Sequence, residues 1–188
     1  MRCAIIGGSI TPRNLSVENT KKFEDIATYF AKNNIEVLTG GCGGYPYLIG
    51  KMCIRHKAAV HGYSAANNKK EHVEIYEHPI NGCSSISFLE NDEKNINYRF
   101  LLRSLPLIFN ADVIIAIEGN WGTLFELITG IICGKKIIIW QGFGGICDTF
   151  YSIYTTLAND CQYNYGESVF IANSIGEIIK ILDNITCN

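Results

Sequence analysis

The chain has 188 residues, of which 47% are hydrophobic and 18% are charged, and its formal net charge is −2. A chain of this length can bury one good hydrophobic core, so residues 1–188 are expected to form a single domain. The small net charge supplies no basic field, which argues against nucleic acid as a partner. The small net charge is compatible with a small anionic ligand that is held by local dipoles.

The eight cysteines and four histidines show no metal-ligand spacing, since there is no CxxC pair and no histidine at ligand spacing from a cysteine. The sequence therefore predicts neither a metal site nor a cofactor. No signal peptide precedes the first apolar stretch, so most cysteines are expected to be small core or surface residues of a cytoplasmic protein. No apolar run approaches the length of a membrane span, and no membrane contact is predicted.

Short apolar stretches alternate with helical patterns along the chain. Strands are predicted at residues 2–6, 35–39, 58–63, 84–88, 113–117, 136–140 and 169–172. Helices are predicted from Ser16, from Tyr45, across residues 101–109, from Thr123, across residues 148–157 and after Ser174. This alternation is typical of βαβ units and predicts a Rossmann-like α/β domain, with a mostly parallel sheet and helices on both faces.

Two features interrupt the regular pattern. Residues 64–82 are polar and irregular, so they are expected to form a solvated excursion with Glu71 and His72 on its surface. Pro106 lies inside a helical pattern, where its missing N–H frees the Leu102 carbonyl and should kink the helix near Arg103.

Three glycine-rich turns, at residues 7–9, 40–44 and 119–122, follow predicted strands. Ligands of parallel α/β sheets bind outside the carboxyl ends of the strands, so these turns are expected to line one crevice. The third turn leads directly into a helix, where free N–H groups and the helix dipole favour an anion. The sequence thus predicts a phosphate site at this turn.

The helix that follows the third turn allows a second interpretation. Thr123-x-x-Glu126 also satisfies the capping-box pattern, in which Glu126 binds only the N-cap amide. Ser174-x-x-Glu177 is another capping box, and no glycine cluster lies beside it. The spacing alone favours a capping role for Glu126, whereas the abundance of glycine around residue 119 favours a ligand-binding site.

Several common nucleotide and hydrolase motifs are missing from the glycine turns. Neither GxGxxG nor GxxxxGK[ST] can be fitted to any of them, so an ordinary dinucleotide fingerprint or Walker loop is not supported. A GxSxG nucleophile elbow is also missing.

The residues around the third turn resemble a known family. Residues 119–126, GNWGTLFE, resemble the PGGxGTxxE signature of the Lonely Guy (LOG) family, once called lysine decarboxylase-like, within the SLOG superfamily. Residues 40–47, 62–66 and 142–146, together with Glu71-His72, resemble a GLPY-type branch of it. The chain differs from the signature at Glu118, where the family has proline, and at Asn120, where it has glycine.

The resemblance implies a nucleoside 5′-monophosphate phosphoribohydrolase, which hydrolyses the N-glycosidic bond and releases a free base. Arg103, nine residues before Asp112, stands where the family has its catalytic arginine, and Glu126 takes the second catalytic place; the alternative for Arg103 is a helix-surface cation. Trp121 and Tyr45 are candidates to stack on the base. The expected phosphate-binding residues are Gly8, Ser9, Gly41, Gly44, Gly119, Asn120, Trp121, Gly122 and Thr123.

Two further expectations concern the alternative function and the assembly. Related folds serve as nucleotide sensors and molybdenum-cofactor carriers, so a non-catalytic binder is the rival to the hydrolase. Residues 124–133 carry more apolar positions than one sheet face needs, and the family generally pairs through helices near the site. A homodimer is therefore predicted.

Overall fold

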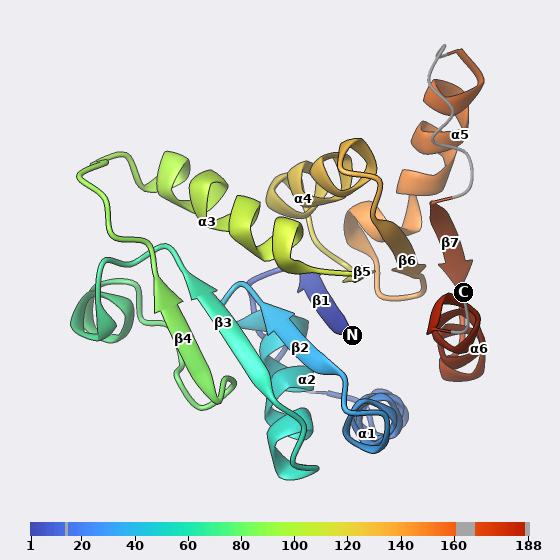
Figure 1. Cartoon of the computed structure of the whole chain (residues 1–188), viewed down its shortest axis with the longest axis horizontal. Coiled ribbons are helices and arrows are strands. Elements are labelled where there is room, and N and C mark those ends of the chain that lie inside the picture. Colours follow the sequence, from blue (N-terminus) through green and yellow to red (C-terminus); the bar gives the residue numbers. More distant parts are fainter. Residues whose placement is uncertain (14, 161–167, 187–188) are drawn as a thin grey trace.

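The computed structural model describes residues 1–13, 15–160 and 168–186. The described residues form one α/β domain built on a seven-stranded sheet (Figure 1). The strands are β1 (Arg2–Gly7), β2 (Glu36–Thr39), β3 (Val60–Ser64), β4 (Ser85–Phe88), β5 (Val113–Ile117), β6 (Lys136–Trp140) and β7 (Val169–Ala172). Their order is β4-β3-β2-β1-β5-β6-β7, and every pairing among the described residues is parallel. The predicted fold class is confirmed.

Helices cover both faces of this sheet. They are α1 (Val17–Lys32), α2 (Gly44–Arg55), α3 (Ile96–Asn110), α4 (Trp121–Ile132), α5 (Phe150–Asp160) and α6 (Ile175–Thr186). In Figure 1, α3, α4 and α5 lie on one side of the strands, and α1, α2 and α6 lie on the other. Ser16 caps α1 by accepting a hydrogen bond from the Asn19 amide, as expected of an N-cap serine.

The core has two layers because successive strand side chains point to opposite faces of the sheet. Ile5 and Ile115 pack with residues of α1, α2 and α6, whereas Ile6 and Ile114 pack with residues of α3, α4 and α5. Strands β1, β5 and β6 are therefore apolar without alternation, as strands covered on both faces are. Each fully buried side chain of this size contributes about 1.5–3 kcal/mol to folding.

The excursion between β3 and β4 differs from its prediction. It contains a π-helical turn, η1 (Glu71–Ile75), and His72 is fully buried, with its Nδ1 2.8 Å from Ser64 Oγ. Glu71 forms an ion pair with Arg99 of α3, with 2.9 Å between Oε1 and Nη1. The prediction of surface positions for Glu71 and His72 is wrong, because these contacts fold the polar segment back onto the end of β3 and onto α3.

Helix α3 continues through Pro106 to Asn110. Pro106 therefore does not end the helix, and the kink near Arg103 stays a prediction. The six described cysteines are free thiols, and Cys161 and Cys187 lie outside the described residues. Among the described residues, no helix is both long and apolar enough to cross a bilayer.

Candidate functional site

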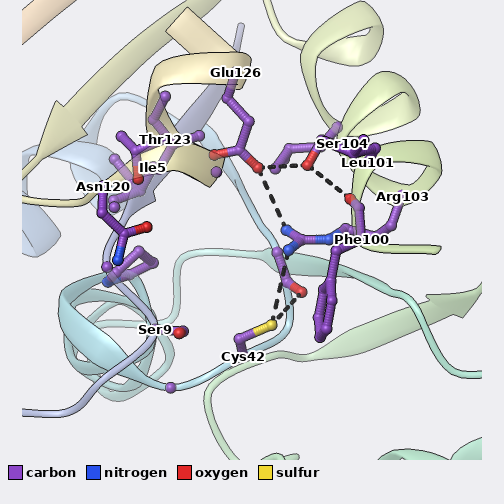
Figure 2. A pocket seen from close by; sticks show the side chains of 18 of the residues that line it. Ile5, Ser9, Cys42, Phe100, Leu101, Arg103, Ser104, Asn120, Thr123 and Glu126 are labelled. Atoms are coloured by element: carbon purple, nitrogen blue, oxygen red, sulfur yellow. Dashed lines mark hydrogen bonds and ion pairs between the residues drawn. The ribbon is translucent and has the colours of Figure 1, made fainter. Parts of the chain in front are cut away.

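A cavity of about 320 Å³ opens where the strand order changes direction, between β1 and β5. This is the position at which open parallel sheets bind ligands. It is lined by the chain after β1, the turn between β2 and α2, one face of α3 and the start of α4 (Figure 2). All three glycine turns contribute lining residues, so the predicted common crevice is present.

Two helix N-termini reach this cavity. The N-cap of α4 is Asn120 and that of α2 is Gly43, and neither makes a side-chain capping hydrogen bond. Asn120, Gly122, Thr123 and Gly43 all line the cavity. The first-turn amides of α4 have no acceptor within the helix, so they favour an anion in the cavity.

The predicted phosphate-binding residues fall into two groups. Gly8, Ser9, Asn120, Gly122 and Thr123 line the cavity, whereas Gly41, Gly44, Gly119 and Trp121 do not. The three glycines of the second group have φ of 64°, 81° and 91°, in the left-handed region that glycine adopts without strain. They shape turns whose neighbouring residues line the cavity.

The two aromatic side chains proposed to stack on a base lie elsewhere. Trp121 is 84% exposed and is not part of the cavity lining. Tyr45 packs edge to face against Phe23 and Phe143, with ring centroids 5.7 and 5.2 Å apart. Tyr45 therefore belongs to a hydrophobic cluster on the α1 and α2 side of the sheet.

A buried acid and base meet at the centre of the cavity. Glu126 Oε1 lies 2.7 Å from the Ser104 hydroxyl and 3.5 Å from Arg103 Nη1. Figure 2 shows Glu126 on α4 facing Ser104 and Arg103 on α3. Burial raises the pKa of Glu126, while Arg103 and the Ser104 hydrogen bond oppose that rise.

The capping interpretation of Glu126 is wrong. Helix α4 begins at Trp121 with Asn120 as N-cap, so Thr123 is already its third residue and cannot be the N-cap. The Glu126 side chain instead reaches across to α3. Glu177 does what a cap does, because its carboxylate accepts a 2.7 Å hydrogen bond from the Asn173 amide at the start of α6.

Arg103 is not a surface cation, since only 11% of its side chain is exposed. Its Nη2 lies 3.9 Å from Cys42 Sγ, and its guanidinium lies over the Phe100 ring, 5.7 Å from the ring centroid. A Cβ at Gly40 would overlap the guanidinium, so glycine at this position makes room for it. Arg103 Nε is buried and has no hydrogen-bond partner among the described residues.

Glu118 changes the third turn in two ways. Its φ is 57°, which a proline ring, fixed near −65°, cannot adopt, so the backbone here differs from that of a turn with proline. Its carboxylate also lies against the first glycine turn, because a Cβ on Gly8 would be 2.5 Å from Glu118 Oε2. Burial raises the pKa of Glu118, while a hydrogen bond to the Gly119 backbone opposes the rise.

The glycine turn after β6, residues 141–145, packs against the third glycine turn. The Ile146 amide donates a 2.8 Å hydrogen bond to the Gly119 carbonyl. A side chain at Gly145 would collide with the backbone of residues 118–119. The late turn therefore packs directly on the third glycine turn and holds its shape.

Some lining residues were missed by the sequence analysis, namely His78, Asn97, Phe100 and Ser104. Ser104 follows Arg103 on the helix predicted across residues 101–109, which was a usable signal, whereas Phe100 lies just before that predicted range. Cys42 lies inside the glycine turn at residues 40–44, which was expected to line the crevice, although it was not named as a site residue. His78 carried no such signal, since its place depends on the folding of the excursion.

The fold and the cavity together define a Rossmann-like α/β protein with a ligand pocket at the switch point of a parallel sheet. The chain belongs to the SLOG cluster4 family, whose profile matches residues 1–179. No curated protein matches the chain significantly.

Solved structures share this fold at low sequence identity. The structural-genomics protein TM1055 aligns with a TM-score of 0.74 and 23% identity, over 97% of this chain and 98% of that one. The molybdenum cofactor binding protein from Rippkaea orientalis aligns with a TM-score of 0.66 and 19% identity, over 98% and 95%. DNA processing protein A from Helicobacter pylori aligns with a TM-score of 0.66 and 17% identity, over 98% and 80%.

The last of these structures corrects one prediction. The Helicobacter protein is described for its single-stranded DNA binding mode, so the exclusion of nucleic acid drawn from charge is wrong. A net charge near zero excludes little for a single strand, because base stacking and local positive groups can hold it without a strongly basic domain.

Among the described residues, no group of three or more histidine, cysteine, aspartate or glutamate side chains is placed to hold a metal ion.

Proposed function

We propose that the protein hydrolyses the N-glycosidic bond of a nucleoside 5′-monophosphate, as the LOG branch of the superfamily does. The observation that carries this proposal is the buried Glu126, held by Ser104 and Arg103 beside an uncapped helix N-terminus in a single cavity. The cavity volume is at the lower end of the range for small-ligand pockets, roughly 300–1,000 Å³.

In this mechanism the 5′-phosphate binds at the start of α4, with Gly8 and Ser9 across the cavity. Binding energy at the phosphate, remote from the reacting bond, then positions the ribose. Water adds to C1′ as the bond to the base nitrogen breaks; the water gives up one proton to the Glu126 carboxylate, and the departing base nitrogen takes one up, so that the products are the free base and ribose 5-phosphate. The Glu126 carboxylate orients this water and stabilises the positive charge that develops on the sugar.

Arg103 has two effects in the same step. Its charge favours the ionised form of Glu126 against the cost of burial. Its guanidinium also offers donors to the phosphate or to the departing base. Ser104 fixes the carboxylate oxygen nearest to Arg103 through the 2.7 Å hydrogen bond, so it acts as a positioning residue.

The direct test is incubation of the purified protein with a panel of nucleoside monophosphates, followed by chromatographic measurement of free base and ribose 5-phosphate. Equimolar release of the two products from at least one member supports the proposal. Release from none of them, at protein concentrations that bind the ligand, would refute it.

One observation favours a second candidate, a non-catalytic binder of a nucleotide or of the molybdenum cofactor. Glu118 places a carboxylate beside Gly8 and bends the turn in a way that proline could not, and a binder tolerates such changes more easily than a catalyst. Mass spectrometry of small molecules that co-purify with the protein tests it, since an intact nucleotide or pterin would favour the binder.

A further inference from the structure

The cavity extends beyond the groups used in the proposed mechanism. In Figure 2, Ser9 and Asn120 lie on one side of Glu126 and Arg103, and Phe100 and Leu101 lie on the other. His78 and Asn97 also line the cavity, the latter from the first turn of α3. In the proposed mechanism, neither the phosphate nor the reacting bond occupies the part of the cavity near Phe100 and Leu101.

His78 supplies an unused polar group to this part of the cavity. Its Nε2 is buried and has no hydrogen-bond partner among the described residues. A buried polar atom without a partner costs roughly 1–3 kcal/mol, so a ligand atom that pairs with it binds favourably. Burial, and after it the charges of His72 and Arg103, lower the pKa of His78 to about 4. The ring is therefore neutral near pH 7, with one nitrogen as donor and the other as acceptor.

Aromatic neighbours hold the His78 ring in place. Its centroid lies 6.2 Å from that of Phe100, 5.9 Å from Tyr76 and 5.4 Å from His72. The Tyr76 and Phe100 rings are themselves 6.1 Å apart. These contacts group four rings at tilted or edge-to-face angles, and His78 Nε2 and His72 Nε2 both lack a hydrogen-bond partner among the described residues.

The backbone that carries His78 is also fixed. The His78 amide donates a 3.0 Å hydrogen bond to the His72 carbonyl, and His72 is bound to Ser64 at the end of β3. The ion pair between Glu71 and Arg99 joins the same segment to α3. The excursion therefore presents His78 from a rigid support, as a residue that selects a ligand requires.

We propose that His78 and Phe100 form the subsite for the base of the nucleotide. The inference rests on the proposed function only in taking the ligand to be a nucleoside monophosphate. A purine or pyrimidine has flat apolar faces that pack against Phe100 beside the Arg103 guanidinium, which lies over the same ring, and a polar edge that pairs with His78 Nε2. With the phosphate at the start of α4, this arrangement places the bond between base and sugar beside Glu126.

The test compares two ligands that differ only by the base. Binding of a nucleoside monophosphate and of ribose 5-phosphate is measured by calorimetry for wild type and for His78→Phe, which keeps an aromatic ring but removes both nitrogens. We expect the monophosphate to bind about 10-fold more weakly to the variant, the scale of one lost hydrogen bond. Ribose 5-phosphate should bind equally to both proteins.

Two further variants provide a control and a second test of the subsite. His61→Phe is the matched control, because the His61 ring bonds Ser85 and Ser87 on β4 and is not part of the cavity lining. Phe100→Leu retains bulk and removes the flat face, so it should also weaken the monophosphate selectively. This second variant keeps the test decisive if His78→Phe does not fold.

The outcomes separate this inference from the proposed function. Equal affinity of monophosphate and ribose 5-phosphate for wild type, or equal weakening of both ligands in the variants, would overturn the subsite. If wild type releases base and both variants keep full monophosphate affinity, the proposed hydrolase activity is supported and the proposed subsite is refuted. Selective weakening in a protein that releases no base would establish the subsite and remove the hydrolase.

Discussion

Replacement of Glu126 by glutamine separates the chemistry of this side chain from its packing. Glutamine has the same shape, and its carbonyl oxygen can still accept the hydrogen bond from Ser104 that is 2.7 Å long in the structure. It carries no charge and cannot accept a proton. Loss of a general acid or base typically lowers a rate by at least ~10²-fold, which corresponds to about 2.7 kcal/mol of transition-state stabilisation. We expect base release to fall by that factor.

The same variant should not lose stability, and the sign follows from the pKa. Burial raises the pKa of Glu126 in spite of Arg103, so the ionised carboxylate opposes folding. The stability contributed by this group is complete below its unfolded-state pKa and is lost as the pH rises through its folded-state pKa. The melting temperature of Glu126→Gln relative to wild type should therefore increase as the pH rises from about 4, the ordinary glutamate pKa, through the raised folded-state pKa of Glu126.

The assay pairs free-base release with melting curves, and Glu177→Gln serves as the matched control. Glu177 caps α6 through the Asn173 amide, and glutamine also satisfies such a cap, so this variant should release base at the wild-type rate. If Glu126→Gln releases base as fast as wild type, the carboxylate has no part in the reaction. If it instead melts well below wild type at neutral pH, the electrostatic reasoning fails.

Three further predictions concern the walls of the cavity and the assembly. Gly40→Ala should displace the Arg103 guanidinium and lower base release, measured as free base, by up to ~10²-fold, the cost of a misplaced catalytic group. Glu118→Gln should strengthen ribose 5-phosphate binding by about 10-fold, since two unit charges even ~10 Å apart repel by ~1.7 kcal/mol at an effective dielectric constant of ~20; unchanged calorimetric affinity would contradict this. The homodimer stays a prediction, motivated by the exposed Phe109 of α3 and Ile132 of α4, and a monomeric mass by light scattering at micromolar concentration would exclude it.

The strands were predictable because both faces of the sheet are covered. The predicted ranges at residues 113–117, 136–140 and 169–172 agree with β5, β6 and β7, since buried parallel strands are continuous apolar runs. The third strand was predicted two residues too early. The Ala58 amide bonds the Cys53 carbonyl and Lys57 has a φ of 66°, so residues 57–58 close α2 before the strand begins, which the apolar character of Ala58 does not reveal.

The site was only partly predictable, because spacing along the chain does not show which side chains face each other across the fold. Glu126 fits a capping box by spacing, and only the position of α3 shows that it bonds Ser104 instead. Gly41, Gly44 and Gly119 were expected to bind the phosphate. In the structure they have positive φ and shape the turns, and they are not part of the cavity lining. His78 is the extreme case, because its place depends on His72 and Glu71, two residues of a polar segment that fold inward rather than toward solvent.

The difference between Glu118 and the proline of the LOG signature is a change of backbone as well as of charge. A φ of 57° at this residue lets the following turn lie against Gly145, and a proline there would require the turn to be rebuilt. The likeness of the glycine turn to the signature therefore carries less weight for activity than it does for fold. The case for catalysis rests instead on Glu126, Ser104 and Arg103, since their contacts join two helices and do not depend on the shape of the turn. Burying the two ionisable groups of this pair in the cavity lining has a desolvation cost of several kcal/mol per group, which their mutual attraction only offsets, and the fold alone does not require it.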